Sequence, residues 1–119
     1  MRLGVISDTH GVLRDEVIEK LKGCDYIIHA GDVGGKEIID KLEGITKTFV
    51  VRGNNDKDQW GLTLPEYKEI EMDEVLIYFV HNKADIPKDL KEVDLVIYGH
   101  SHKFSNEKID NIVYLNYMI

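Results

Sequence analysis

The stretch Leu3-Gly4-Val5-Ile6-Ser7-Asp8-Thr9-His10 decides the fold, because a short apolar run ends directly in polar residues. The run at 3–6 predicts a buried β-strand, and Asp8 and His10 follow where that strand ends. Strands of a parallel sheet release their C-terminal loops along one edge, so residues far apart in sequence converge there. We therefore expect Asp8 and His10 to belong to a site assembled from several strands.

Other polar blocks follow apolar runs in the same way, and four of the five histidines of the chain lie in blocks of this kind. The further blocks are Gly31-Asp32, Gly53-Asn54-Asn55-Asp56, His81 and Gly99-His100-Ser101-His102. Taken singly, each block is also compatible with ordinary turn chemistry. Taken together, they bring oxygen and imidazole donors without thiolates, a set that is typical of hard or borderline divalent metals.

Apolar runs alternate with helical patterns in the first half of the chain. We expect strands at 3–6, 26–29 and 48–51, and helices at 14–22 and 36–43. In the first of these helices, apolar residues recur at helical spacing, and Gly23 ends the pattern. Strands that alternate with short helices indicate parallel βαβ units.

The second half has a different character. We expect an antiparallel pair of strands at 67–71 and 75–80, one or two helical turns at 87–92, a strand at 95–98, and a hairpin formed by 106–109 and 112–118. The fold class is therefore α/β (α+β layered), a minimal mixed β-sheet sandwich flanked by helices that pack mainly on its first half. We expect the last strand to be an edge strand, and hence a homodimer formed through it.

Length and composition narrow the class of protein. The 119 residues predict a single domain, 1–119, and the single cysteine, Cys24, excludes internal disulfides. The net charge of -7, from 22 acidic and 15 basic residues, argues against stable nucleic-acid binding. No apolar run approaches the roughly 18 residues that span a membrane, and the chain enters a strand-like segment at once. We expect no membrane contact and a cytoplasmic location.

The ordered pattern of Asp-x-His, Gly-Asp, Gly-Asn-x-Asp, His and Gly-His-x-His resembles the calcineurin-like metallophosphoesterases, in particular their small prokaryotic phosphodiesterase branch. The resemblance runs from Met1 to about Asn116. It implies a metallophosphoesterase-like fold and a dinuclear metal-dependent phosphoesterase, above all a phosphodiesterase, that acts on a small phosphoester.

Carried over by position, the resemblance also implies a ligand set for two divalent metal ions that share one carboxylate. The first ion would be bound by Asp8, His10, Asp32 and His102. The second would be bound by Asp32, Asn54, His81 and His100. We expect manganese, with nickel, iron, cobalt or zinc as alternatives, because imidazole and carboxylate together suit all of these metals.

The residue types fit phosphate chemistry. Two divalent ions, two carboxylates and a bridging hydroxide leave the centre with a net charge of about +1, inside an acidic protein. Metal binding lowers the pKa of water from about 15.7 towards 7, so that hydroxide is available at neutral pH. We expect in-line attack of that metal-bridging hydroxide on phosphorus, with Asp32, Asn54 and Asn55 as the catalytic residues.

Three departures from the family pattern affect the expected substrate. Many relatives have a histidine at the position of Asn55 that protonates the leaving group, and asparagine cannot act as a general acid near neutral pH. We therefore expect a preference for acidic leaving groups such as aryl alcohols. Asn82 replaces the usual glycine after His81, and 116–119 stand where the family usually continues through an Asn-Pro-Gly-Ser turn.

Two alternative functions remain open from the sequence. A phosphomonoesterase would use the same ligands, and a non-catalytic metal-binding scaffold would share the fold, as does the retromer subunit. Four further polar or aromatic residues have simpler interpretations. We expect a structural role for His29, a brace within its own loop for Asp56, a core position for Trp60, and either substrate contact or loop anchoring for Arg52.

Overall fold

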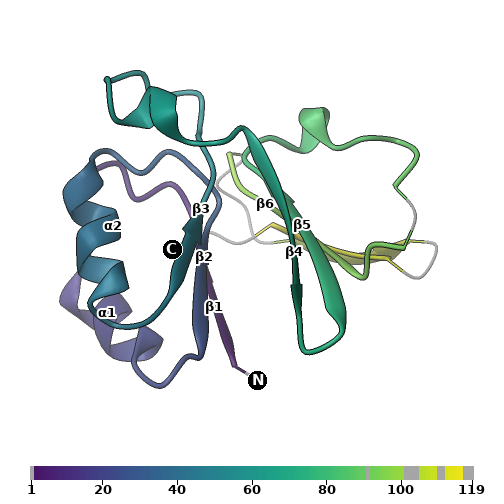
Figure 1. Cartoon of the computed structure of the whole chain (residues 1–119), viewed down its shortest axis with the longest axis horizontal. Coiled ribbons are helices and arrows are strands. Elements are labelled where there is room, and N and C mark those ends of the chain that lie inside the picture. Colours follow the sequence, from purple (N-terminus) through teal and green to yellow (C-terminus); the bar gives the residue numbers. More distant parts are fainter. Residues whose placement is uncertain (1, 91, 101–104, 110–111, 117–119) are drawn as a thin grey trace.

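Two β-sheets lie side by side, and two helices cover the outer face of the first sheet (Figure 1). The computed structural model describes residues 2–90, 92–100, 105–109 and 112–116. The helices are α1 (Asp15–Leu21) and α2 (Lys36–Glu43), and two short 3-10 helices are η1 (Gly61–Thr63) and η2 (Lys83–Asp85). The strands are β1 (Leu3–Ile6), β2 (Tyr26–His29), β3 (Thr48–Val50), β4 (Tyr67–Met72), β5 (Val75–Val80), β6 (Leu95–Tyr98), β7 (Ser105–Ile109) and β8 (Ile112–Asn116).

The first sheet contains β1, β2 and β3 in that order, all parallel, as the alternation of strands and helices predicts. Because side chains alternate across a strand, neighbouring residues of β2 face opposite layers. Ile27 packs with Leu21 of α1 and Leu42 of α2, whereas Ile28 packs with Phe79 and Ile97 of the second sheet. The main core therefore has two layers, one under the helices and one between the sheets.

The second sheet has the strand order β4-β5-β6-β8-β7, with both parallel and antiparallel neighbours. β8 lies between β6, to which it is parallel, and β7, to which it is antiparallel. The prediction that the last strand is an edge strand is therefore wrong, and the expected homodimer loses that basis. A strand followed by a hairpin can place its final strand inside the sheet, and the sequence pattern does not distinguish this order from the simpler one.

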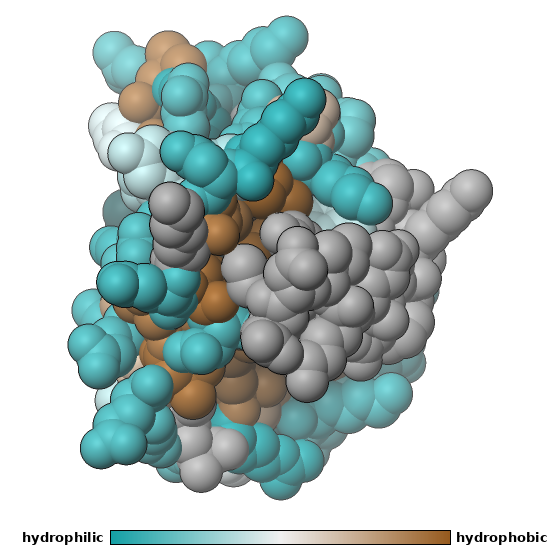
Figure 2. All heavy atoms as spheres, turned by 90° about the vertical axis from the view of Figure 1, so that its right-hand side faces the viewer, coloured by the Kyte–Doolittle hydropathy of each residue, from teal (hydrophilic) through white to brown (hydrophobic). Residues whose placement is uncertain are grey.

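The helical turns predicted at 87–92 are also wrong. The short helix is instead η2, where the Asn82 side chain accepts a hydrogen bond of 3.0 Å from Ala84 N. Pro87 disfavours helical backbone at the residue before it, so the helix ends early. Ile86 and Leu90 pack against Tyr78, Val80 and other residues on the outer face of the second sheet. Figure 2 shows this side of the molecule, where a band of apolar atoms lies between hydrophilic side chains.

β4 and β5 are joined by a two-residue turn at Asp73 and Glu74, which have φ angles of 47° and 68°. Positive φ at both positions is the type I′ geometry that suits the right-handed twist of a hairpin. The turn holds the register that pairs Tyr67 with Val80. In the part of the chain that the structure describes, no helix has the length and apolar character needed to cross a membrane.

Candidate metal centre

The polar blocks converge where strands of both sheets end. Asp8 follows β1, Asp32 follows β2, and His81 follows β5 directly. All three are buried, with 8%, 2% and 4% of their surface exposed, although ionisable groups are seldom buried without partners. Asn54 and His100 follow β3 and β6, and both are exposed. The candidate ligands therefore include three buried residues, Asp8, Asp32 and His81, and two exposed ones, Asn54 and His100.

Asp32 lies at the centre of the arrangement. Its Oδ1 accepts a hydrogen bond of 2.9 Å from Asn55 N, and its Oδ2 accepts one of 2.9 Å from Asn55 Nδ2. His81 Nε2 lies 3.3 Å from Asp32 Oδ2, and His10 Nε2 lies 3.9 Å from the same oxygen. Burial alone would raise the pKa of Asp32, but His81 and Asn55 outweigh it and lower that pKa well below its usual range. Asp32 is therefore a carboxylate, as a metal ligand must be.

His81 is oriented for metal binding. Its Nδ1 lies 2.7 Å from the Ala30 carbonyl oxygen and donates to it, so Nε2 carries the lone pair in the neutral ring. A backbone carbonyl that fixes the ring in this way is a common outer partner of metal-binding histidines. Nε2 is buried and has no hydrogen-bond partner among the described residues. A cation beside this nitrogen and the Asp32 carboxylate would satisfy both groups.

A proton can bind the same nitrogen when no metal is bound. Burial alone would lower the pKa of His81, but the adjacent Asp32 carboxylate and the hydrogen bond to the Ala30 carbonyl, together with the charge of Asp8, raise it. Metal and proton therefore compete for Nε2, and metal affinity should increase as the pH rises.

The two oxygens of Asp8 face different surroundings. Oδ2 accepts hydrogen bonds from Ser7 Oγ at 2.6 Å and from His100 N at 3.1 Å. Oδ1 lies 3.9 Å from His10 Nε2 and 3.8 Å from His81 Nε2. Asp8 thus connects the loop after β1 to the loop after β6 while its other oxygen points at the imidazoles.

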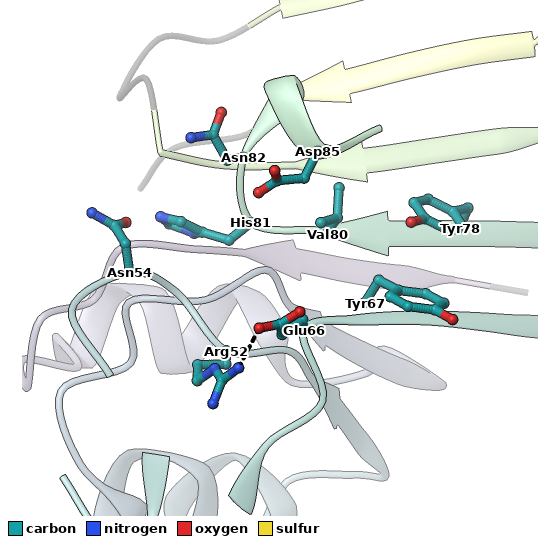
Figure 3. Close-up of a pocket in the computed structure, with 9 residues that line it drawn as sticks. All are labelled: Arg52, Asn54, Glu66, Tyr67, Tyr78, Val80, His81, Asn82 and Asp85. Atoms are coloured by element: carbon teal, nitrogen blue, oxygen red, sulfur yellow. Dashed lines mark hydrogen bonds and ion pairs between the residues drawn. The ribbon is translucent and has the colours of Figure 1, made fainter. Parts of the chain in front are cut away.

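Among the described residues, two groups of side chains have the geometry to hold a metal ion. One group is Asp8, His10 and Asp32, and the other is Asp32, His81 and His100. Within each group the donor atoms lie within 4.8 Å of one another, and Asp32 belongs to both. Asn54 lines a pocket together with His81 (Figure 3). His102, the remaining ligand implied by the family resemblance, lies outside the described residues.

Asp56 holds together two of the loops that carry the candidate ligands. Its carboxylate is 4% exposed and accepts hydrogen bonds from the backbone N–H groups of Asp32 and Gly53 at 2.9 Å and of Val33 at 3.0 Å. A weaker bond of 3.3 Å comes from Gly34 N. The sequence predicts a brace within one loop, whereas Asp56 joins the loop after β2 to the loop after β3.

Gly53 allows these two loops to approach. A Cβ atom at this position would lie 2.2 Å from both the backbone nitrogen and Oδ1 of Asp32. Real Cβ atoms essentially never lie this close to another heavy atom, so any larger residue would displace Asp32. Gly99 has the same role on the other side, where a Cβ would lie 2.9 Å from Asp8 Oδ2.

Four candidate ligands have left-handed backbone conformations. The φ angles are 57° for Asp8, 49° for His10, 56° for Asp32 and 74° for His100. Such conformations cost about 1–3 kcal/mol each for residues other than glycine and cluster at functional sites. The surrounding hydrogen bonds hold these residues in place, which is typical of a site whose geometry is fixed before it binds.

His29 has the structural role expected from the sequence. It is fully buried, its Nδ1 accepts from Gly31 N at 3.1 Å, and its Nε2 lies 2.9 Å from Thr9 Oγ1. The Thr9 hydroxyl donates onward to the Val33 carbonyl oxygen at 2.8 Å, so Nε2 is the protonated nitrogen of His29. Burial, with help from His81, lowers the pKa of His29 to about 3.

Sequence reasoning did not single out Ser7 or Thr9. The Ser7 hydroxyl donates a hydrogen bond to Asp8, and the Thr9 hydroxyl is hydrogen-bonded to His29. In the sequence, Thr9 stands between the candidate ligands Asp8 and His10. Their position inside that block is the signal that could have identified them. Trp60 packs at the edge of the helix-side core, as predicted, and Arg52 is ion-paired with Glu66 at 2.5 Å.

Pockets border both groups of candidate ligands in the described part of the chain. One has a volume of about 360 Å³ and contains Asn54 and His81. The other has a volume of about 330 Å³ and contains Asp8 and His10, with Val12 and Leu13 beyond them. Both volumes fall in the range of ligand-binding pockets.

Comparisons with known proteins agree with this geometry. Residues 1–117 match the domain described as the calcineurin-like phosphoesterase superfamily domain. A probable metallophosphoesterase of Methanocaldococcus jannaschii is 34% identical, and the match covers 98% of this chain and 66% of that protein, so the chain spans slightly less than two thirds of that relative. A phosphodiesterase of the same organism is 25% identical, over 98% of this chain and 82% of the relative.

A solved structure shares the fold. The crystal structure of wild-type Vps29 complexed with Zn²⁺ from Entamoeba histolytica has a TM-score of 0.79 and 25% identity, over 98% of this chain and 73% of the other. The fold class predicted from the sequence is therefore confirmed.

Proposed function

The chain belongs to the calcineurin-like phosphoesterase superfamily, and we propose that it is a two-metal phosphodiesterase. The observation that supports this most strongly is the pair of donor groups that share Asp32. A carboxylate with two oxygens can bridge two ions about 3.5–4 Å apart, the separation typical of two-metal phosphoesterases. The resemblance of the chain to a protein named phosphodiesterase is consistent with this proposal.

The residues divide into two ligand sets. Asp8, His10 and Asp32, with His102, would hold the first ion. Asp32, Asn54, His81 and His100 would hold the second. The bound ions, manganese in our proposal, would supply positive charge for the phosphate and activate water as the nucleophile.

The protein's own residues fix the geometry of this chemistry. Asp32 is held by two hydrogen bonds from Asn55, so its carboxylate keeps one orientation through the reaction. Asn54 is exposed beside His81, where its amide can contact the phosphate oxygens or an ion without adding charge. Asn55 donates to Asp32 and cannot deliver a proton, which favours substrates whose alcohol leaves as a stable anion.

The preference for a diester rests on the two pockets. A phosphodiester carries two alcohol groups on phosphorus, and one pocket is lined by His81 while another is lined by His10. A monoester would fill only one of them. We therefore propose that diesters are the better substrates.

Metal loading and turnover test this function. Protein stripped with a chelator and reloaded with Mn²⁺ is expected to hydrolyse bis(p-nitrophenyl) phosphate faster than p-nitrophenyl phosphate, and Asp32→Asn to abolish both activities. Asp40→Asn is the matched control, because Asp40 is an exposed carboxylate on α2 that pairs only with Lys36 among the contacts described. A faster monoesterase rate would favour the phosphomonoesterase alternative. Full turnover by Asp32→Asn would refute the metal assignment, and tight metal binding without turnover would favour a non-catalytic scaffold.

A further inference from the structure

The pocket on the His81 side extends beyond the ligands to a pair of aromatic rings. In Figure 3, Asn54 and His81 lie at one end of the pocket, and Tyr67 and Tyr78 lie at the other. Val80 lies between the two ends on the same strand as Tyr78. A ligand whose phosphate lies at the metal centre can therefore extend along β5 towards the tyrosines.

Strand pairing explains why the two rings meet. Tyr67 is directly opposite Val80 in the antiparallel register, and Tyr78 is two residues before Val80, so all three side chains share one face of the sheet. The ring centroids of Tyr67 and Tyr78 are 5.6 Å apart with an interplanar angle of 18°, which is a stacked arrangement. Diagonal neighbours in a sheet are within reach of aromatic side chains.

The two tyrosines differ in exposure. Tyr78 is 5% exposed, whereas Tyr67 is 59% exposed and is one of the large hydrophobic side chains that lie exposed among the described residues. The buried ring holds the exposed ring in place, so little conformational entropy is lost when a ligand stacks on Tyr67. A pre-oriented exposed ring at the edge of a pocket is a platform for another aromatic ring.

The charges of the pocket indicate what kind of group fits. Away from His81, Arg52 is ion-paired with Glu66, and Asp85 adds a second carboxylate. The lining is therefore net acidic and would repel a second phosphate or a carboxylate on the ligand. An uncharged group that offers hydrogen-bond donors, such as an amino-substituted base, is compatible with it.

We propose that this pocket binds the aromatic, uncharged alcohol group of a phosphodiester, a nucleoside or an aryl alcohol, with its ring stacked on Tyr67. The placement of the phosphate rests on the proposed function, but the affinity for an aromatic group does not require turnover. The specificity of the enzyme would then lie in the β4–β5 hairpin and not in the metal ligands.

Direct binding tests this assignment. Adenosine 5′-phosphate and ribose 5-phosphate differ only by the base, so the ratio of their dissociation constants on Mn²⁺-loaded protein, measured by calorimetry, isolates the ring. We expect adenosine 5′-phosphate to bind at least about 10-fold more tightly, a ratio equivalent to about 1.4 kcal/mol. Tyr67→Ala is expected to bring the ratio close to one, and Tyr67→Phe to preserve it.

The matched control is Leu62→Ala, which removes an equally exposed apolar side chain, 59% exposed, outside this pocket. It is expected to leave the ratio unchanged. Equal binding of the two ligands by the unmodified protein, or an unchanged ratio in Tyr67→Ala, would overturn the proposal. A base preference in a protein that shows no turnover would refute the proposed function alone, whereas turnover without a base preference would refute the aromatic pocket alone.

Discussion

Replacement of Asp56 by asparagine should destabilise the metal-free protein by roughly 3–4 kcal/mol. The carboxylate accepts four backbone N–H groups from the loops after β2 and β3. The two oxygens divide these donors, since Asp32 N and Gly53 N bond Oδ2 while Gly34 N bonds Oδ1 and Val33 N contacts both. Whichever oxygen becomes the amide nitrogen, about two N–H groups then face a donor.

The magnitude follows from the number of bonds lost. Hydrogen bonds to a charged group contribute about 1.5–3 kcal/mol each, and two of them at the lower end account for the expected loss. For a domain of this size the melting temperature should fall by roughly 10–15 °C. Urea unfolding in the presence of a chelator measures the change without any contribution from bound metal.

Asp58→Asn is the matched control for this experiment. Asp58 accepts a single backbone hydrogen bond, from Gly61 N at 2.8 Å, and an asparagine oxygen can still accept it. Its free energy of unfolding should change by less than about 1 kcal/mol. The reasoning is refuted if Asp56→Asn is no less stable than Asp58→Asn, because the four N–H groups would then not depend on the charge of Asp56.

Three further predictions concern pH, the hairpin turn and the leaving group. Because the pKa of His29 is lowered to about 3, the unfolded chain binds a proton below about pH 6.5 that the folded chain does not. The metal-free protein should therefore lose about 1.5–2 kcal/mol of unfolding free energy between pH 6.5 and 5. Urea unfolding should show a weaker dependence of stability on pH in His29→Gln, and an equal dependence would contradict this. Asp73→Asn combined with Glu74→Gly places the preferred residues in the type I′ turn and should raise the free energy of unfolding by roughly 1 kcal/mol, whereas a loss in thermal denaturation would argue against that turn type. Asn55→His adds an ionisable donor beside Asp32 and should raise kcat for alkyl esters at least about 10-fold relative to aryl esters, within the range of general-acid catalysis. An unchanged ratio of the alkyl-ester kcat to the aryl-ester kcat would show that proton delivery does not limit the reaction.

The sequence predicts the first half of the fold closely because its signals are local. Apolar runs that end in Asp8, Asp32 and Asn54 mark the parallel strands, and the spacing of Ile38, Ile39 and Leu42 marks α2. The interior position of β8 could not be predicted in this way, since it depends on which strand pairs with β6. The short helix forms before Pro87, because Asn82 caps its start.

The candidate site shows the same division. The residue types at 8, 10, 32, 81 and 100 identify the ligand candidates from sequence alone. Other contacts depend on how chain segments approach in space. Examples are the hydrogen bonds of Asp56 to a second loop and the stacking of Tyr67 on Tyr78. No periodicity or motif in the sequence predicts those contacts.

The left-handed backbone at the candidate ligands has a consequence for protein engineering. Glycine or asparagine relieves such a conformation, so each would be favoured over the native residue at His10 and His100, which are exposed. A library selected only for heat resistance in metal-free buffer would therefore enrich substitutions at these two positions and discard the proposed ligands. At His10 and His100, the residue that would bind metal is less stable in this backbone conformation than glycine or asparagine. A design protocol that optimises stability must therefore hold both positions fixed.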